Sequence, residues 1–299
     1  MKKTIVLFLA LGVFGCSGAQ DSPTPRWTMT LRVLGDEGQP LPDARVWVAY
    51  SDPKEGESLD PLRPNGWAVG GFTDTNGMFS ATHENTRSSS LGLHIQKDGY
   101  YPTVVVYELG AGYDPKQWNL SPTWVVKRIR DPIPMYAKSV RTVPPTGVES
   151  AGYDFMSGDW VSPYGKGKTT DVVVKRSPGS GWMISFPNAG DGIQAFTNPP
   201  TRFPGDGSAL RSPHKAPEGG YESELVRKDY NENGNYFIRV RTVLDSQGQV
   251  KRALYGKIYG DFMRFRYYLN PKANDLNVEF DPKHNLLTGL KSFEQVGAP

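Results

Sequence analysis

The chain has 299 residues, enough for about two domains, and carries 34 Lys and Arg against 31 Asp and Glu. This near balance of charge gives no sign of the strongly basic domain that is typical of nucleic-acid binding, so no nucleic acid is expected as a partner. The single cysteine excludes an intramolecular disulfide and a cysteine-based zinc site, so we expect the fold to be stabilised by packing alone.

The N-terminus has the organisation of an export signal. Lys2 and Lys3 precede an apolar run from Ile5 to Phe14, and Gly15 and Cys16 follow it. The run is shorter than the roughly 20 apolar residues that a membrane-spanning helix needs. A basic start, a short apolar core and small residues after it are typical of a secretory signal that is removed.

The four residues Val13-Phe14-Gly15-Cys16 resemble the lipobox of bacterial lipoproteins, with Phe14 bulkier than the residue usual there. The resemblance implies that residues 1–15 are a signal peptide and that Cys16 is lipidated as the new N-terminus. The protein would then be exported and anchored to a membrane through its lipid, since several acyl chains give stable anchoring. Ser17 after the cysteine favours the outer membrane. The alternative is cleavage after Ala19, which predicts a soluble secreted or periplasmic protein.

The remaining composition favours many short strands. The 33 glycines and 25 prolines separate short runs of β-branched and aromatic residues, and long segments with helical periodicity are essentially absent. We therefore predict an all-β protein with two β-sandwich domains, the second with a jelly-roll-like arrangement as one option. The predicted boundaries are a flexible tether at 16–26, a first sandwich at 27–131, a proline connector at 132–138 and a second sandwich at 139–299.

The first predicted strand alternates cleanly. Trp27, Met29, Leu31 and Val33 share one face, with polar residues between them. Asn76-Gly77 predicts a tight turn, because this pair tolerates the positive φ that hairpin turns need. Further strands of the first domain are predicted at 44–50, 91–96, 103–109 and 124–130.

Three segments in order carry a resemblance to a known family. Asp36–Val46, Thr73–Phe79 and Lys97–Pro102 resemble the carboxypeptidase regulatory-like domain, over roughly residues 27–109. The resemblance implies a small transthyretin-like Greek-key β-sandwich that acts as an accessory module and has no peptidase site. The acidic, proline-rich insertion at 51–65 is expected to be an exposed loop.

Strands of the second domain are predicted at 170–176, 182–186, 222–228, 235–244, 250–259 and 262–269, the last three as a meander. The stretch Gly158–Gly167 resembles uncharacterised bacterial lipoproteins that carry the same first module, which implies no activity. Trp160 is expected in the core, where large aromatic side chains usually lie.

Alternation along the meander predicts a cationic and aromatic face. Tyr236, Ile238, Val240 and Leu244 would lie on the inner face, with Leu254, Ile258, Phe265, Tyr267 and Leu269. Side chains on the outer face would suit an anionic polysaccharide, with arginines giving bidentate contacts to acid groups. The alternative is a solvated or paired face without a ligand. The candidate ligand-binding residues are Arg239, Arg241, Tyr255, Lys257, Tyr259, Arg264, Arg266 and Tyr268.

No motif predicts a catalytic residue, a metal site or a cofactor. The four histidines lack zinc-site spacing, and Asp229–Gly234 matches half of a calcium loop but has Val240 where the bidentate glutamate is required. We therefore expect a non-catalytic envelope lipoprotein that binds a polysaccharide or an envelope protein. The alternatives are a glycan-acting hydrolase with its carboxylates in the second domain, and a purely structural spacer.

Overall fold

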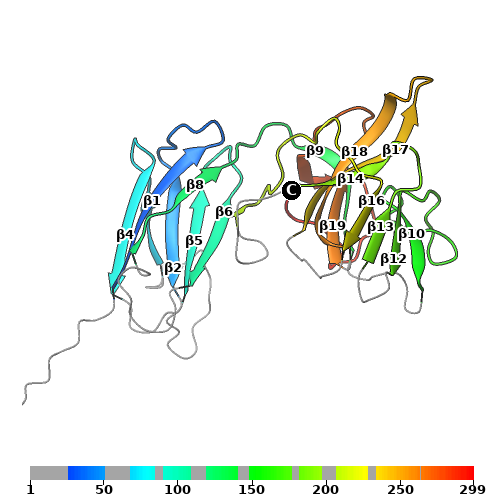
Figure 1. Cartoon of the computed structure of the whole chain (residues 1–299). Helices are drawn as coiled ribbons and strands as arrows, with labels where there is room; N and C mark the ends of the chain where they lie inside the picture. The colour runs from blue at the N-terminus through cyan, green and yellow to red at the C-terminus, as the bar shows by residue number, and fades with distance from the viewer. Residues whose placement is uncertain are drawn as a thin grey trace, which may run out of the picture.

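The computed structural model describes residues 26–50, 68–84, 90–108, 119–140, 148–176, 182–196, 207–227, 234–262 and 264–299. Throughout these ranges the chain is all-β, as predicted, and forms two modules that lie side by side (Figure 1). None of the described residues forms a helix long and apolar enough to cross a membrane. The export signal, Cys16, the tether up to residue 25, the insertion at 51–65 and the half calcium loop up to residue 233 lie outside the described residues.

Two facing sheets form the N-terminal module. In one, β1 pairs with β4 in antiparallel fashion and with β7 and β8 in parallel fashion; the other has the order β15-β6-β5-β2-β3. The first strand in this order, β15, pairs with β6 at the edge of the sheet and comes from far along the chain. The strands are β1 (Arg26–Gly35), β2 (Arg45–Tyr50), β3 (Ala68–Phe72), β4 (Met78–Glu84), β5 (Ser90–Gln96), β6 (Thr103–Glu108), β7 (Asn119–Leu120), β8 (Thr123–Val126) and β15 (Gly207–Ser208).

The core of this module confirms the predicted alternation. Trp27, Met29, Leu31 and Val33 of β1 are fully buried and join one hydrophobic cluster with residues of β2, β5 and β6. The turn at Gly77 is also confirmed, with φ of 73°. Glycine is required there for two reasons. The positive φ disfavours residues with a side chain, and a Cβ would lie 2.3 Å from the Val33 carbonyl oxygen.

The C-terminal module also consists of two sheets, with orders β11-β10-β12-β13-β16 and β14-β17-β18-β19-β9-β20. β17, β18 and β19 form the predicted meander. The strands are β9 (Ile133–Val140), β10 (Ser150–Asp154), β11 (Asp159–Trp160), β12 (Val172–Arg176), β13 (Trp182–Ser185), β14 (Gly192–Ala195), β16 (Glu224–Arg227), β17 (Asn235–Leu244), β18 (Val250–Asp261), β19 (Arg264–Leu269) and β20 (Phe280–Asn285).

Side chains from both sheets fill the space between them. Trp160 is buried, as expected, and its ring lies edge-on to Tyr153 at a centroid distance of 5.1 Å. The predicted inner face of the meander is confirmed for eight of its nine residues, all in this core: Tyr236, Ile238, Val240, Leu254, Ile258, Phe265, Tyr267 and Leu269.

The predicted proline connector at 132–138 is wrong, because β9 occupies most of it. β9 pairs with β19 only from Tyr136 onward, so Pro132 and Pro134 precede this ladder and remove none of its hydrogen bonds. The second module therefore begins at about β9. The predicted range 139–299 also misplaces β15, which pairs with Thr103 and Val104 of the N-terminal module.

Candidate functional site

The predicted cationic and aromatic face is largely covered. Tyr255, Lys257, Tyr259 and Tyr268 are at most 5% exposed. Tyr255 packs in a cluster with Ala216, Val278 and other residues that follow or precede the meander in the chain. The expectation of an open face is therefore wrong for these four, because segments distant in sequence cover the outer side of β18 and β19. Arg264 and Arg266 are exposed, and ligand binding by the whole set stays a prediction.

The two arginines of β17 point to opposite sides of the sheet. The register with β18 shifts between Val240 and Val243, and Arg241 has a φ of 57°. A bulge of this kind re-aims the side chain that follows it. The Arg239 Nε donates to the Gly190 carbonyl oxygen at 2.7 Å, and its guanidinium lies 4.7 Å from the centre of the Tyr221 ring. The expectation that Arg239 and Arg241 share one face is therefore wrong.

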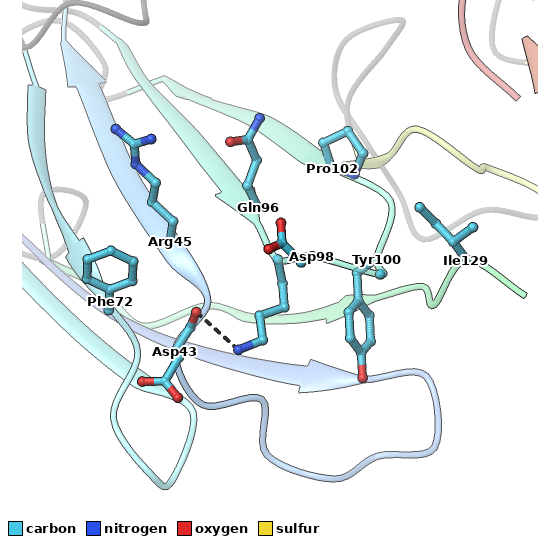
Figure 2. A pocket seen from close by; sticks show the side chains of 10 residues that line it. Asp43, Arg45, Phe72, Gln96, Asp98, Tyr100, Pro102 and Ile129 are labelled. Carbon is cyan, nitrogen blue, oxygen red and sulfur yellow. Dashed lines mark hydrogen bonds between the residues drawn. The ribbon is translucent and has the colours of Figure 1, made fainter. Parts of the chain in front are cut away.

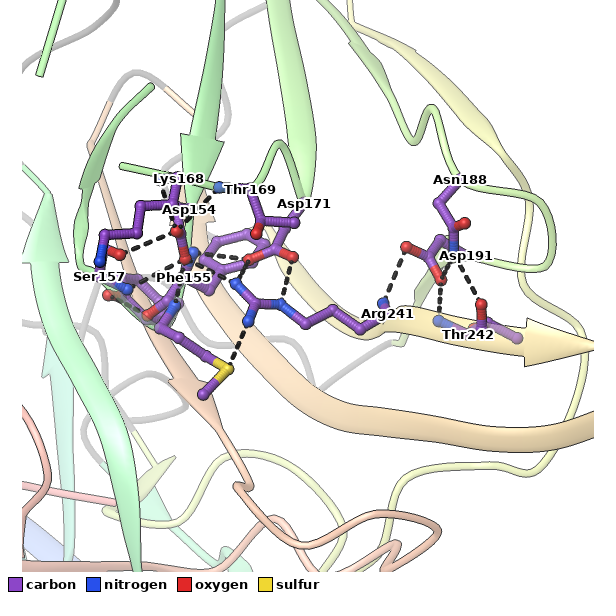
Figure 3. A network of polar contacts seen from close by, with 12 residues as sticks. Asp154, Phe155, Ser157, Lys168, Thr169, Asp171, Asn188, Asp191, Arg241 and Thr242 are labelled. Carbon is purple, nitrogen blue, oxygen red and sulfur yellow. Dashed lines mark hydrogen bonds and ion pairs between the residues drawn. The ribbon is translucent and has the colours of Figure 1, made fainter. Parts of the chain in front are cut away.

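Arg241 instead holds the two sheets of the C-terminal module together (Figure 3). Its Nη2 lies 2.7 Å from Asp154 Oδ1, and its Nε lies 2.8 Å from Asp171 Oδ1. Asp154 also accepts backbone N–H bonds from Ser157, Lys168 and Thr169. Burial opposes ionisation of Asp154, but these N–H donors outweigh it and lower the pKa to about 2. The network is a structural clamp, since the charged side chains of Arg241, Asp154 and Asp171 pair with one another across the two sheets.

A buried lysine lies where the modules meet. Lys257 is 0% exposed; its Nζ lies 3.2 Å from Ser212 Oγ and 4.8 Å from the centre of the Tyr268 ring. Burial, with a further contribution from nearby Lys127, lowers the pKa of Lys257 well below its ordinary value. The Lys127 Nζ donates to the carbonyl oxygens of Arg211 and Ser212, and burial lowers the pKa of Lys127 to about 8.

Glu279 completes the contact between the modules. Its Oε1 accepts hydrogen bonds from the Tyr101 hydroxyl at 2.7 Å and from the Arg130 backbone N–H at 2.9 Å, and its Oε2 accepts from Asp131 N–H. Glu279 is 1% exposed, so these donors replace its lost hydration. Together with β15, they attach the C-terminal module to the end of the N-terminal one.

A solvent-open pocket of about 570 Å³ lies on the N-terminal module, at one end of the sheet that contains β2 and β5 (Figure 2). Its apolar rim includes Phe72, which is 66% exposed, and Ile129, which is 39% exposed. Large apolar side chains at such exposure on opposite sides of one hollow are a feature of binding sites. The lining consists of Asp43, Arg45, Phe72, Gln96, Lys97, Asp98, Gly99, Tyr100, Pro102 and Ile129.

Polar groups at the centre of this pocket have no hydrogen-bond or ion-pair partner in the part of the chain that the structure describes. No hydrogen bond or ion pair joins the Arg45 guanidinium, the Gln96 amide or the Asp98 carboxylate to another described residue. Lys97 differs, because its Nζ donates to the Asp43 carbonyl oxygen at 3.3 Å. The pocket thus offers a donor-only group, an acceptor-only group and an amide that does both.

Arg45 is held in place by an aromatic stack. Its guanidinium carbon lies 5.5 Å from the centre of the Trp47 ring. Trp47 in turn stacks on His94 at a centroid distance of 4.9 Å and an interplanar angle of 6°. Burial lowers the pKa of His94, so the imidazole is neutral at pH 7, and Arg45 supplies a cation to the indole.

None of these pocket residues was a sequence-based candidate. The available signal was the strand Arg45-Val46-Trp47-Val48, whose alternation places Trp47 on the solvent side. Within the described residues, no group of three or more His, Cys, Asp and Glu side chains is placed to hold a metal ion.

No protein-family model matches the chain, and no curated protein is detectably similar to it. Solved structures resemble it only remotely. The 3-chlorocatechol 1,2-dioxygenase of Rhodococcus opacus 1CP is 15% identical over 37% of this chain and 62% of its own, with a TM-score of 0.28. The chain thus spans less than two thirds of that enzyme. A shaft pilin of Lactobacillus rhamnosus GG is 14% identical over 56% of this chain and 90% of its own, with a TM-score of 0.25.

A candidate carbohydrate-binding protein of Bacteroides uniformis is 9% identical over 83% of this chain and 98% of its own, with a TM-score of 0.20. Such values assign no function to the chain.

Proposed function

We propose that this protein is a non-catalytic lipoprotein of the cell envelope that binds a polysaccharide through the pocket of its N-terminal module. The observation that carries the proposal is one open hollow in which the exposed Phe72 ring and the half-buried Tyr100 ring lie beside polar groups that have no hydrogen-bond partner among the described residues. Sugars present an apolar C–H face and a rim of hydroxyls. The rings of Phe72 and Tyr100 suit the apolar face. The hydroxyls suit the polar side chains of Arg45, Gln96 and Asp98.

The pocket is better suited to binding than to hydrolysis. A glycosidase needs two carboxylates, one of them in an apolar setting that keeps it protonated at neutral pH. Asp43 and Asp98 both line the pocket, but both are exposed. Neither therefore has the setting of a general acid, and the hydrolase remains the second candidate only for the predicted carboxylates of the C-terminal module.

The proposed anchor is the lipid on Cys16, which would hold the binding module at the membrane surface, with the outer membrane favoured. Intact mass spectrometry of the protein from the membrane fraction should give an N-terminus at Cys16 with added acyl mass. Cys16→Ala should move the protein out of the membrane fraction. An unmodified N-terminus at Gln20, as cleavage after Ala19 predicts, would support the soluble form instead.

The binding proposal is tested by screening the soluble two-module protein on an array of bacterial and plant glycans. Phe72→Ala and Arg45→Ala should each clearly weaken retention on any glycan that the wild type retains. Both side chains are exposed, so their loss leaves the fold intact. Release of reducing sugar from a retained glycan would contradict a purely binding role, and an array without positives would contradict the proposal itself.

A further inference from the structure

The side chains of the pocket form a row across the strands. Strand register places Arg45 of β2 opposite Phe72 of β3 on one side and opposite Gln96 of β5 on the other. Ile95 pairs with Thr103, so Pro102 is the next position beyond Gln96. Phe72, Arg45, Gln96 and Pro102 therefore run perpendicular to the strands, along one end of the sheet (Figure 2).

The length of this row exceeds a single sugar. Neighbouring strands lie about 4.8 Å apart, so three spacings cover ~14 Å. Apolar groups lie at both ends, Phe72 at one and Pro102 with Ile129 at the other, and the polar groups that have no hydrogen-bond partner among the described residues lie between them. A ligand that uses the whole row has to be a chain of several units that enters at one end and leaves at the other.

The charges of the lining cancel. Asp43 and Asp98 balance Arg45 and Lys97, and the Asp98 carboxylate has no described partner that would neutralise it locally. An acidic sugar attracted by Arg45 would meet the repulsion of Asp98 in the same hollow. Hydroxyl groups satisfy both side chains, because each hydroxyl donates to a carboxylate and accepts from a guanidinium.

We infer that the row from Phe72 to Ile129 binds an internal stretch of a neutral, hydroxyl-rich glycan chain that lies across the strands. This inference rests on the proposed function and concerns another surface than the meander, where the sequence suggested an anionic polysaccharide. Stacking of Arg45 on Trp47 makes Trp47 a positioning residue. It fixes the guanidinium before the ligand arrives and so removes part of the ordering cost of binding.

The test uses neutral, uronate-bearing and sulfated oligosaccharides of one to about eight units, with affinities measured by calorimetry at low and high salt. Neutral chains of about three units or more should bind at least about tenfold more tightly than their monosaccharides, with little change between about 0.05 and 0.5 M salt. Phe72→Ala and Arg45→Ala should each weaken binding about tenfold or more. Phe293→Ala and Arg252→Ala, exposed positions on the C-terminal module, are the matched controls and should change nothing.

Trp47→Leu keeps an apolar side chain but removes the stack. It should weaken the longer neutral chains through a larger entropic penalty, while Arg45→Lys, which cannot donate two parallel N–H bonds, should not restore wild-type affinity.

The outcomes separate the inference from the proposed function. If acidic chains bind more tightly at the same residues and in a salt-sensitive way, the inference of a neutral glycan is wrong, but the glycan-binding site remains. Equal affinity for monosaccharides and long chains would overturn the extended row. Glycan binding that survives Phe72→Ala and Arg45→Ala, or no glycan binding at all, would overturn the proposed function as well.

Discussion

The hydroxyl of Tyr101 donates to Glu279 Oε1 at 2.7 Å and so joins two residues that are 178 positions apart and belong to different modules. The neighbouring Tyr100 lines the pocket. One dipeptide thus contributes a ring to the candidate binding site and an anchor to the contact between modules. Because Glu279 is buried, the anchor is sensitive to loss of any donor.

Tyr101→Phe should lower the free energy of unfolding by about 1.5–3 kcal/mol, since it removes one hydrogen bond to a buried charged group. Thermal unfolding followed by circular dichroism measures this. Tyr100→Phe is the matched control. Its hydroxyl has no partner among the described residues, and it should leave the midpoint unchanged. Equal effects of the two substitutions would contradict the assigned contact.

The gain in the free energy of unfolding from Lys257→Met should increase as the pH falls. The ordinary pKa of the amine is 10.5 and the folded-state pKa lies well below it, so the unfolded chain binds a proton that the folded chain rejects. The lysine thus costs stability below about pH 10.5, increasingly down to its folded pKa and constantly below that.

The unfolding midpoints of Lys257→Met and of the wild type should therefore diverge as the pH falls from about 10.5, with the variant gaining stability. Lys251→Met, on the same strand but exposed, provides the control. A difference that stays constant as the pH falls would mean that Lys257 is charged in the folded protein.

Asp154 should protect the protein from acid. Its folded pKa of about 2 lies below the ordinary value of 3.8, so its contribution is complete above about pH 4 and is lost as the pH falls through 2. Asp154→Asn should cost about 1.5–3 kcal/mol at pH 7, because it removes one of the two carboxylates that pair with Arg241 and leaves the Asp171 pair in place. The stability gap to the wild type should shrink as the pH falls toward 2. Asp245→Asn, in an exposed turn, should show neither effect.

Alanine substitutions at two glycines distinguish the cost of a left-handed backbone from the cost of a steric clash with the added Cβ. Gly77 and Gly38 have φ values of 73° and 83°, but only Gly77 has a backbone oxygen within 2.3 Å of the position of an added Cβ. Gly38→Ala should cost about 1 kcal/mol for its left-handed backbone alone. Gly77→Ala should cost clearly more in urea unfolding, because the Val33 carbonyl has to move. Similar midpoints for the two variants would contradict this turn geometry.

Alternation of apolar and polar residues predicted the features of the fold that depend on residues close in sequence. The burial of Trp27, Met29 and Leu31 follows from alternation along a single strand, and the meander from three strands joined by short turns. Arg241 departs from the pattern because a one-residue bulge, which alternation does not reveal, turns its side chain to the opposite face.

The burial of strand residues by segments distant in sequence was not predictable in the same way. The burial of Lys257 depends on Ser212, and its setting includes Glu279; both lie in segments whose position over the sheet no periodicity specifies. The pocket was missed for a related reason. Its row requires the register of Phe72 against Arg45, across an insertion that breaks the sequence pattern between β2 and β3.

The most direct test of glycan binding by the N-terminal module is heteronuclear NMR of the two-module protein titrated with a positive neutral oligosaccharide. We predict that the backbone amide signals of Arg45, Gln96, Asp98 and Tyr100 shift, while those of Arg264 and Arg266 stay where they are. Shifts confined to the exposed arginines of β19, with the pocket unaffected, would contradict a binding site on the N-terminal module.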